Sequence, residues 1–190
     1  MTSWIIIAVI VIAAVYLTLA YNSLVRMCNS VENAWRQIDV QLKRRHDLIP
    51  NLVQAVKGYM QFERDTLTQV VEARNRAIGA PSQEARLQAE NQLSAGVGRL
   101  FALMENYPQL KSDDNVLQLQ EQLTTTENQI AFARQAYNDS VLDLNNRIET
   151  FPTNIIAEHF GFHPANYFQA PAEDQVLPKV DLSLGSPRAS

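Results

Sequence analysis

The sequence predicts an all-α protein, in which a transmembrane helix at the N-terminus is followed by a soluble bundle of long helices. Three observations support this fold class. The chain opens with an uncharged apolar run, apolar residues then recur at helical spacing, and only 6 of its 190 residues are glycine and 8 are proline. Hydrophobic residues make up 46% of the chain and charged residues 19%, which is typical of a folded protein and not of a disordered one.

The apolar run covers residues 4–20 and is rich in Ile and Val. As an α-helix it rises about 26 Å. With the flanking Ser3 and Tyr21 it reaches the ~18 to 20 residues that a bilayer core requires, and the rings of Trp4 and Tyr21 stand at the two interfacial depths that aromatic rings prefer. A cleaved signal peptide needs a basic start and a shorter apolar segment, and no Lys or Arg precedes this run. We therefore expect residues 1–21 to be an uncleaved membrane anchor.

Basic residues lie on one side of the anchor only. Lys and Arg close to an apolar run are retained on the cytoplasmic side of a membrane. None precedes the run, whereas Arg26, Arg36 and the cluster Lys43-Arg44-Arg45 follow it. This distribution predicts that the N-terminus lies outside the cell and that the body lies in the cytoplasm.

The residues after the anchor continue a helical repeat with few breaks. Apolar positions between Leu24 and Ile49 step by three and four without an intervening Gly or Pro, so the transmembrane helix is expected to run on into the body. Pro50 is the first interruption, because proline disfavours helix in the residue before it. The repeat resumes after Pro50 in the same seven-residue phase. The pattern alone therefore allows either a turn at Pro50 or a kink in one long helix.

Turn signals divide the rest of the body into helices. The sequence Gly79-Ala80-Pro81 ends a second helix, and Ser82 caps a third. The third helix ends at Asn106-Tyr107-Pro108, and residues 112–115 supply capping side chains for a fourth. This last helix carries apolar residues at every seventh position until Pro152 stops it.

The segment after Pro152 reads as one short helix over residues 153–161, with a polar cap at its start and a glycine stop at its end. Its aromatic residues are expected to fold back on the end of the bundle that is made by the start of the second helix and the end of the fourth. These residues are Phe160, Phe162, Tyr167 and Phe168. Residues 169–190 lack helical periodicity and are expected to form a flexible tail, which leaves residues 22–168 as the helical domain.

Four charged residues fall within the apolar seams of the predicted helices. Arg45 and Glu63 do so in the first half of the body, and Glu127 and Arg134 do so in the fourth helix. These positions either lie at the edge of the bundle, with their charged groups in water, or form a layer of ion pairs that fixes the register of the helices. The pattern alone allows both interpretations.

The histidines and the cysteine do not form a metal-binding or catalytic pattern. A di-iron site in a bundle needs Glu-x-x-His on two helices, and no glutamate stands three residues before His46, His159 or His163. His159 and His163 are four residues apart, but Gly161 breaks the helix that would join them. The single cysteine, Cys28, cannot form an intramolecular disulfide and fits the core of the helical repeat. We expect no catalytic residue, no metal ligand and no cofactor.

Signals for binding phosphate groups or nucleic acid are also lacking. Gly96-x-Gly98 stands alone in an amphipathic segment and fits close helix packing better than a nucleotide loop, and Asp113-Asp114 fits helix capping better than acid–base catalysis. The net charge of −4 argues against nucleic-acid binding. The cluster at residues 43–45 would stand about 30 Å from the membrane along a continuous helix, which is too far to reach lipid headgroups.

Several stretches of the chain resemble the LemA family of bacterial membrane proteins. The most specific is residues 38–53, and the resemblance extends from the anchor to about Phe168. The other matching stretches are Tyr21-Asn22-Ser23-Leu24-Val25, Ala34-Trp35, Glu105-Asn106-Tyr107-Pro108, Thr126-Glu127-Asn128-Gln129-Ile130 with Arg134, Tyr137-Asn138, and Phe151-Pro152 with Gly161-Phe162. The resemblance implies an antiparallel four-helix bundle on one anchor in the inner membrane, and it favours a turn at Pro50 over three long helices with a kink there.

The resemblance implies no enzymatic activity and no cofactor. The sequence therefore favours a non-catalytic protein that is anchored in the lipid bilayer and engages unknown protein partners, with self-association included, through its helical surface or its aromatic C-terminal segment. Neither nucleic acid nor a small-molecule substrate is expected as a partner. The alternatives are a membrane-shaping or lipid-surface assembly protein and a subunit of an unrecognised enzyme complex.

Overall fold

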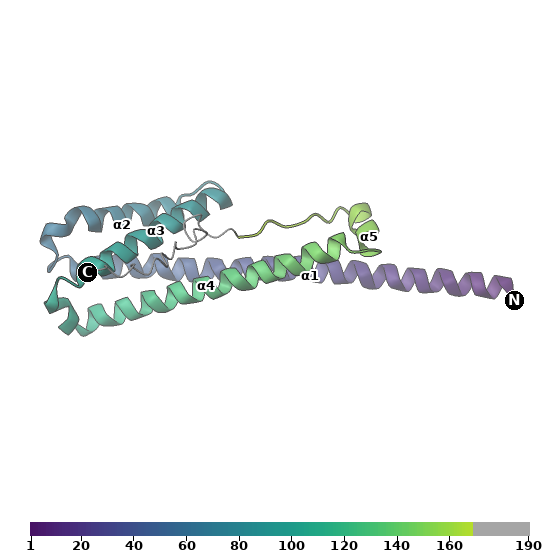
Figure 1. Ribbon diagram of the computed structural model, residues 1–190, viewed down its shortest axis with the longest axis horizontal. Coiled ribbons are helices and arrows are strands. Elements are labelled where there is room, and N and C mark those ends of the chain that lie inside the picture. The colour runs from purple at the N-terminus through teal and green to yellow at the C-terminus, as the bar shows by residue number, and fades with distance from the viewer. Residues whose placement is uncertain (169–190) are drawn as a thin grey trace, which may run out of the picture.

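The computed structural model describes residues 1–168, and within that range it contains helices and connecting turns but no strand (Figure 1). The predicted all-α fold class is confirmed. The expected tail, residues 169–190, lies outside the described residues. The helices are α1 (Thr2–Val56), α2 (Arg64–Ile78), α3 (Gln83–Met104), α4 (Asp114–Glu149) and α5 (Thr153–Phe160), with short 3-10 helices at Gln61–Glu63 and Pro108–Ser112.

Helix α1 runs without a break from the apolar N-terminal segment into the body (Figure 1). It is the one helix among the described residues that is long and apolar enough to cross a membrane. The side chains of residues 1–19 are exposed, and burial then begins abruptly, since Leu19 is 61% exposed and Ala20 only 2%. The continuously exposed part of α1 therefore coincides with the predicted anchor, apart from the contacts at its end.

The turn expected at Pro50 is wrong, because α1 continues through Pro50 to Val56. Proline has no N–H group, so the carbonyl of His46 loses its partner within the helix. The Nε of Arg74 in α2 donates a hydrogen bond of 3.1 Å to this carbonyl oxygen and so replaces the missing bond. Since Ile49 and Val56 are both buried, continuing the helix also keeps the apolar seam in the core. The chain reverses after Val56 instead.

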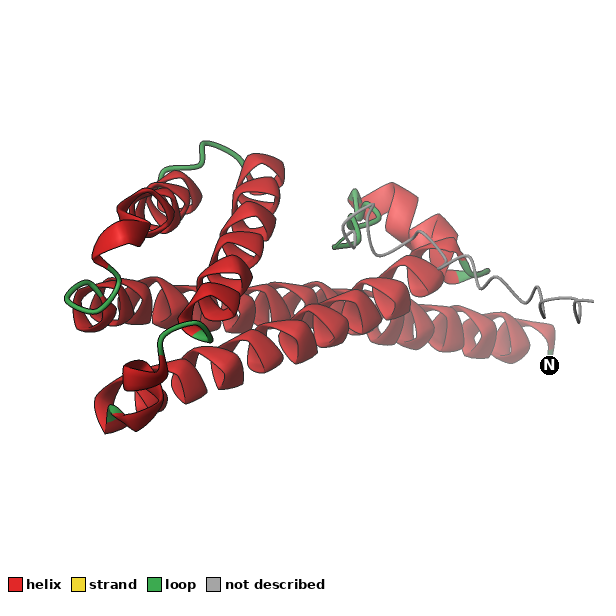
Figure 2. Ribbon diagram, turned by 60° about the vertical axis from the view of Figure 1, so that its left-hand side comes forward, coloured by secondary structure: helices red, strands yellow, loops and turns green. Residues whose placement is uncertain are grey.

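The far end of the body, away from the anchor, contains one apolar core to which all four long helices contribute. Its members include Ile49 and Leu52 from α1, Val70 from α2, Leu93, Val97 and Leu100 from α3, and Val116 and Leu123 from α4. The predicted caps are present here. Ser82 accepts a hydrogen bond of 3.2 Å from the N–H of Ala85, and Asp113 Oδ1 accepts bonds from Asn115 and Val116. Figure 2 shows the α2–α3 hairpin at this end of the long α1–α4 pair.

The half of the body next to the anchor is thinner, because only α1 and α4 extend along it (Figure 1). The two helices are antiparallel. Leu24 of α1 lies in one cluster with Ile148 of α4, whereas Ile49 lies in another with Leu123. Helix α5 and the strap, which we define as residues 161–168, cover this pair.

The strap runs back along α4 and is held by two asparagines of that helix. Asn145 exchanges two hydrogen bonds of 2.9 and 3.0 Å with the backbone of Ala165, and Asn138 exchanges two of 2.7 and 3.0 Å with the backbone of Phe168. Seven residues of helix rise about 10.5 Å and three extended residues span about 10 Å, so both pairs fit at once. The asparagines therefore set the position of the strap along α4.

The expected docking of the aromatic segment is confirmed in part. Phe168 is buried against Trp35 and Tyr137, and Tyr21 contacts Phe160 and Phe162 at ring distances of 5.0 and 5.6 Å. The segment packs on α1 and α4, as predicted for the end of the fourth helix. It does not reach the residues after Pro50, which lie at the other end of the body.

Candidate functional site

A buried ion cluster joins three helices where the thick and thin halves of the body meet. Arg45 of α1 is completely buried. Its Nη1 donates hydrogen bonds of 2.7 Å to Ser94 Oγ and 2.6 Å to Glu127 Oε1, and its Nη2 pairs with the Glu90 carboxylate. Arg45 and Glu127 are therefore members of an ion-pair layer. The edge interpretation is wrong for Arg45, whereas the side chain of Glu127 is still 31% exposed.

Glu90 of α3 is the member of this cluster that the sequence analysis missed. It is completely buried, and its Oε1 lies 2.9 Å from Nε2 of the buried His46. Burial alone would raise the pKa of Glu90, but the hydrogen bond with His46 and the positive charge of Arg45 outweigh it, so the pKa is lowered from its ordinary value. A sequence signal did exist, because Glu90 continues the α3 seam of Leu93 and Val97 at helical spacing.

The other two seam charges lie outside this cluster. Glu63 sits at the far turn, where the hydroxyl of Tyr107 donates a hydrogen bond of 3.4 Å to its carboxylate. Arg134 is half-buried, and its guanidinium carbon stands 4.4 Å from the centre of the Phe168 ring. Burial lowers the pKa of Arg134, and the charge of Arg45 lowers it further. Arg134 therefore holds the strap and takes no part in the ion pairs of Arg45.

The charged groups of the cluster are enclosed by the helices. Arg45 and Glu90 are sealed from solvent, and their charges neutralise each other directly. No group of three His, Cys, Asp or Glu residues that could hold a metal ion occurs within residues 1–168. Burial also raises the pKa of the Cys28 thiol, which keeps it protonated and a weak nucleophile. His159 and His163 are exposed.

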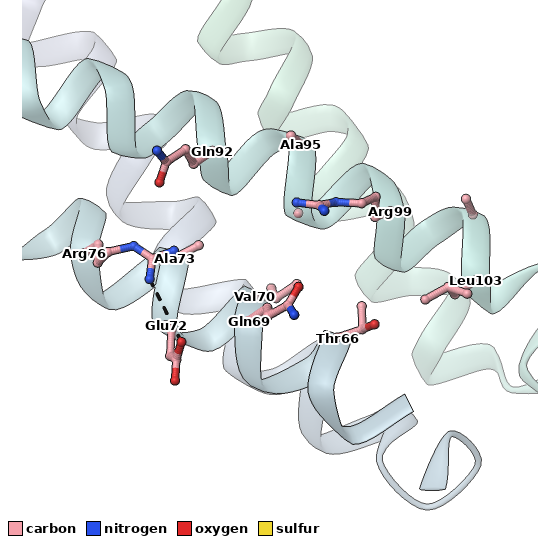
Figure 3. A pocket seen from close by; sticks show the side chains of 12 residues that line it. Thr66, Gln69, Val70, Glu72, Ala73, Arg76, Gln92, Ala95, Arg99 and Leu103 are labelled. Carbon is pink, nitrogen blue, oxygen red and sulfur yellow. Dashed lines mark ion pairs between the residues drawn. The ribbon is translucent and has the colours of Figure 1, made fainter. Parts of the chain in front are cut away.

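The outer faces of α2 and α3 form an open groove of about 690 Å³ (Figure 3). Small residues line much of it, and a Cβ on Gly96 would meet a methyl group of Val70 at 3.6 Å, so the two helices approach closely there. This agrees with the packing role expected for Gly96. The lining residues are Thr66, Gln69, Val70, Glu72, Ala73 and Arg76 of α2, and Gln92, Ala95, Gly96, Arg99, Ala102 and Leu103 of α3.

The groove has few charged groups, and most of them are positive. Its titratable residues are Glu72, Arg76 and Arg99, and Figure 3 shows the two arginines on opposite helices. The guanidinium of Arg76 lies 4.0 Å from the Glu72 carboxylate in the same helix, as an ordinary surface pair. No histidine, cysteine or serine lines the groove, and its one hydroxyl is that of Thr66. The sequence analysis predicted no groove, because its residues belong to the polar faces of two separate helices.

These features define a class of protein. A helix able to span a bilayer continues into a helical bundle, whose core holds an ion cluster and whose surface carries a groove. The molecule is thus a helical-bundle protein with one helix that is able to span a membrane. A model of the LemA family matches residues 34–182, and the chain belongs to that family. The resemblance found in the sequence is confirmed.

Curated relatives extend the same similarity. The chain is 28% identical over 163 residues to Protein LemA of Metamycoplasma hominis, which covers 85% of this chain and 74% of the relative. It is 29% identical over 185 residues to Magnetosome protein MamQ 2 of Paramagnetospirillum magneticum, covering 83% and 68% of the two chains. It is 25% identical over 197 residues to Magnetosome protein MamQ of Magnetospirillum gryphiswaldense, covering 88% and 72%.

Proposed function

We propose that this protein is a non-catalytic scaffold that holds a protein-binding surface at a fixed height above the bacterial inner membrane. The observation that carries this proposal is the continuity of α1 from Thr2 to Val56. One end of the helix is the membrane anchor, and the other end belongs to the core of the bundle. Val56 comes 36 positions after Ala20, which is a rise of about 54 Å along the helix. A continuous helix braced by α4 keeps that height, whereas a flexible linker would not.

The surface that we propose for the partner is the α2–α3 groove. The groove is carried at the far end of the rigid pair, and its floor of small residues admits a close approach by another helix. Arg76 and Arg99 outnumber the single carboxylate of Glu72, so the charges favour a partner helix with acidic residues. The non-catalytic role is supported by the sealed ion cluster of Arg45 and Glu90.

The experiment that tests this proposal compares two glutamines in intact cells. A photo-crosslinking amino acid replaces Gln92 in the groove or, as the matched control, Gln118 on the exposed face of α4 at the same end of the body. Mass spectrometry then identifies the crosslinked products. We expect one defined protein at the Gln92 position and not at the Gln118 position. Products with this same chain would indicate self-association, and equal or absent products at both positions would count against a partner in the groove.

We further propose that the body lies in the cytoplasm, with the N-terminus outside. The support is the distribution of basic residues, because Arg26, Arg36, Lys43 and Arg44 are exposed on the body side and no Lys or Arg precedes the anchor. The buried Arg45 contributes no surface charge. Alkaline phosphatase, which is active only outside the cytoplasm, is fused after Ser190. Inactive fusions that are still produced in full length are expected, and strong activity would reverse the orientation.

A further inference from the structure

Helix α5 lies beside the end of the membrane anchor and not above it. The Oγ1 of Thr153, the first residue of α5, is 3.4 Å from the hydroxyl of Tyr16, and Ile156 and Ala157 pack in one cluster with Ala20. Tyr16 precedes Tyr21, the residue at which the anchor is expected to end, by five residues, or about 7.5 Å along the helix. The start of α5 is therefore about one and a half helical turns deeper than the point at which α1 leaves the membrane.

The exposed side of α5 carries large apolar side chains among polar ones, since Asn154, Glu158 and His159 are exposed there as well. We define the corner as residues 151–160, which comprise the turn after α4 and α5 itself. Phe151 is 75% exposed, Ile155 59% and Phe160 55%. These three large apolar side chains within ten residues form an apolar patch, and the Phe160 ring lies 5.0 Å from that of Tyr21 at the end of the anchor. Elsewhere on the body, Phe62 is exposed at the far turn and Phe132 lies beside Val40 on the surface of the α1–α4 pair. The patch lies next to the exposed apolar surface of the anchor.

We propose that the corner is a second membrane contact, whose apolar side chains enter the boundary between the lipid headgroups and the acyl chains. Interfacial helices sit about 5 to 10 Å into this boundary, which matches the depth of Thr153 relative to Tyr21. The occupant of the patch is lipid, because the patch is continuous with the lipid-facing surface of α1. This inference depends on α1 as the anchor and holds for either orientation of the chain.

The charged residues near the corner fit this depth. Ile148 of α4 lies in one cluster with Ala20 and Leu24, so the adjacent Arg147 and Glu149 are level with the end of the anchor, where headgroups accept charge. A single transmembrane helix leaves the body free to tilt. A second contact to one side of α1 fixes the direction in which the body leans.

The test uses the full chain reconstituted in phosphatidylcholine vesicles that contain a quarter phosphatidylglycerol. In a Cys28→Ser background, Ile155→Cys is labelled with the environment-sensitive fluorophore NBD, and Phe132→Cys, exposed on α4 well above the membrane, is the matched control. Spin-labelled lipids with the nitroxide near the top of the acyl chain quench fluorophores at that depth. We expect blue-shifted emission and several-fold stronger quenching for Ile155→Cys than for the control.

A second labelling site keeps the test decisive if the first variant misfolds. Phe151→Cys lies in the turn, where its side chain makes few contacts, and it is expected to behave like Ile155→Cys. Emission and quenching equal to those of the Phe132→Cys control would place the corner in water and overturn the proposal. Blue-shifted emission without quenching by the lipids would show that protein covers the patch, and this would overturn it as well.

Discussion

The two halves of the body are stabilised in different ways. The far half has a four-helix apolar core, in which each helix buries its own seam against the others. The half next to the membrane has only α1 and α4, and the strap completes its packing through Phe168 and the hydrogen bonds of Asn138 and Asn145. Arg45 marks the junction, since Leu42 belongs to the core of the membrane-side half and Ile49 to that of the far half. A thin pair of helices is thus stabilised by an extended segment that is bound through side-chain amides.

The largest effect is expected at the junction between the halves. Glu90→Ala leaves the buried guanidinium of Arg45 without its fully buried partner, and breaking such a pair costs about 3 to 5 kcal/mol of unfolding free energy. Glu127→Ala is expected to cost about 1 to 2 kcal/mol, since this side chain is 31% exposed and water can replace part of the bond. The measurement is urea unfolding of the full chain in detergent micelles, followed by circular dichroism.

The control for this prediction is Glu121→Ala, which removes an exposed carboxylate from α4. It should change the free energy of unfolding by less than about 0.5 kcal/mol. A loss for Glu90→Ala as small as that of the control would mean that the cluster does not hold the two halves together.

The next largest loss of stability is expected when the buried aromatic ring of the strap is removed. Phe168→Ala removes a ring that is buried among Trp35 and Tyr137 and stacked on Arg134, at a cost of about 3 kcal/mol. Hydrogen exchange should accelerate at Ala165 but not at Leu100 in the far core. The control is Tyr167→Ala, which changes the exposed neighbouring residue. If Phe168→Ala accelerated hydrogen exchange equally at Ala165 and Leu100, the two halves would not be stabilised separately.

A smaller loss of stability is expected when an asparagine side chain that binds the strap is removed. Asn145→Ala leaves the backbone N–H and C=O of Ala165 without their partners, which costs about 1 to 2 kcal/mol. The adjacent Asn146 is exposed, so Asn146→Ala provides the matched control. Amide exchange at Ala165 should become faster in the first variant only. Unchanged exchange there would show that the rings alone hold the strap.

The smallest change in the free energy of unfolding is expected when the pH is lowered. The pKa of Glu90 is lower in the folded protein than the unfolded value of about 4.3, so its contribution to stability is complete above about pH 5 and is lost as the pH falls through the folded value. The slope of unfolding free energy against pH, measured between about pH 5 and pH 3, should be shallower in Glu90→Gln than in the original chain. An identical slope would argue that Glu90 is not charged in the folded state.

Much of this architecture could be predicted from local sequence. The long first helix, the caps at Ser82 and Asp113 and the glycine stop of α5 all follow from spacing and turn chemistry, and Gly161 does adopt the left-handed conformation, with φ of 73°. Such signals act within a few residues of where they appear. The predicted anchor likewise matches the exposed part of α1.

The parts that could not be predicted depend on residues that are distant in sequence. Pro50 stays inside α1 because Arg74, 24 positions later, replaces the hydrogen bond that proline removes. The path of the strap depends on Asn138 and Asn145, which look like ordinary polar residues of a helix surface. The groove exists only once α2 and α3 lie side by side, so neither helix alone reveals it.

Because α1 is unbroken, any tilt of its membrane-spanning part within the bilayer also tilts the body. Transmembrane helices tilt by about 20° on average, and the tilt varies with the thickness of the membrane. Over the length of about 54 Å between Ala20 and Val56, a change of about 10° in tilt would sweep the α2–α3 groove sideways by about 9 Å. A change in the thickness of the bilayer around the anchor would therefore move the α2–α3 groove sideways, because α1 is continuous between the two.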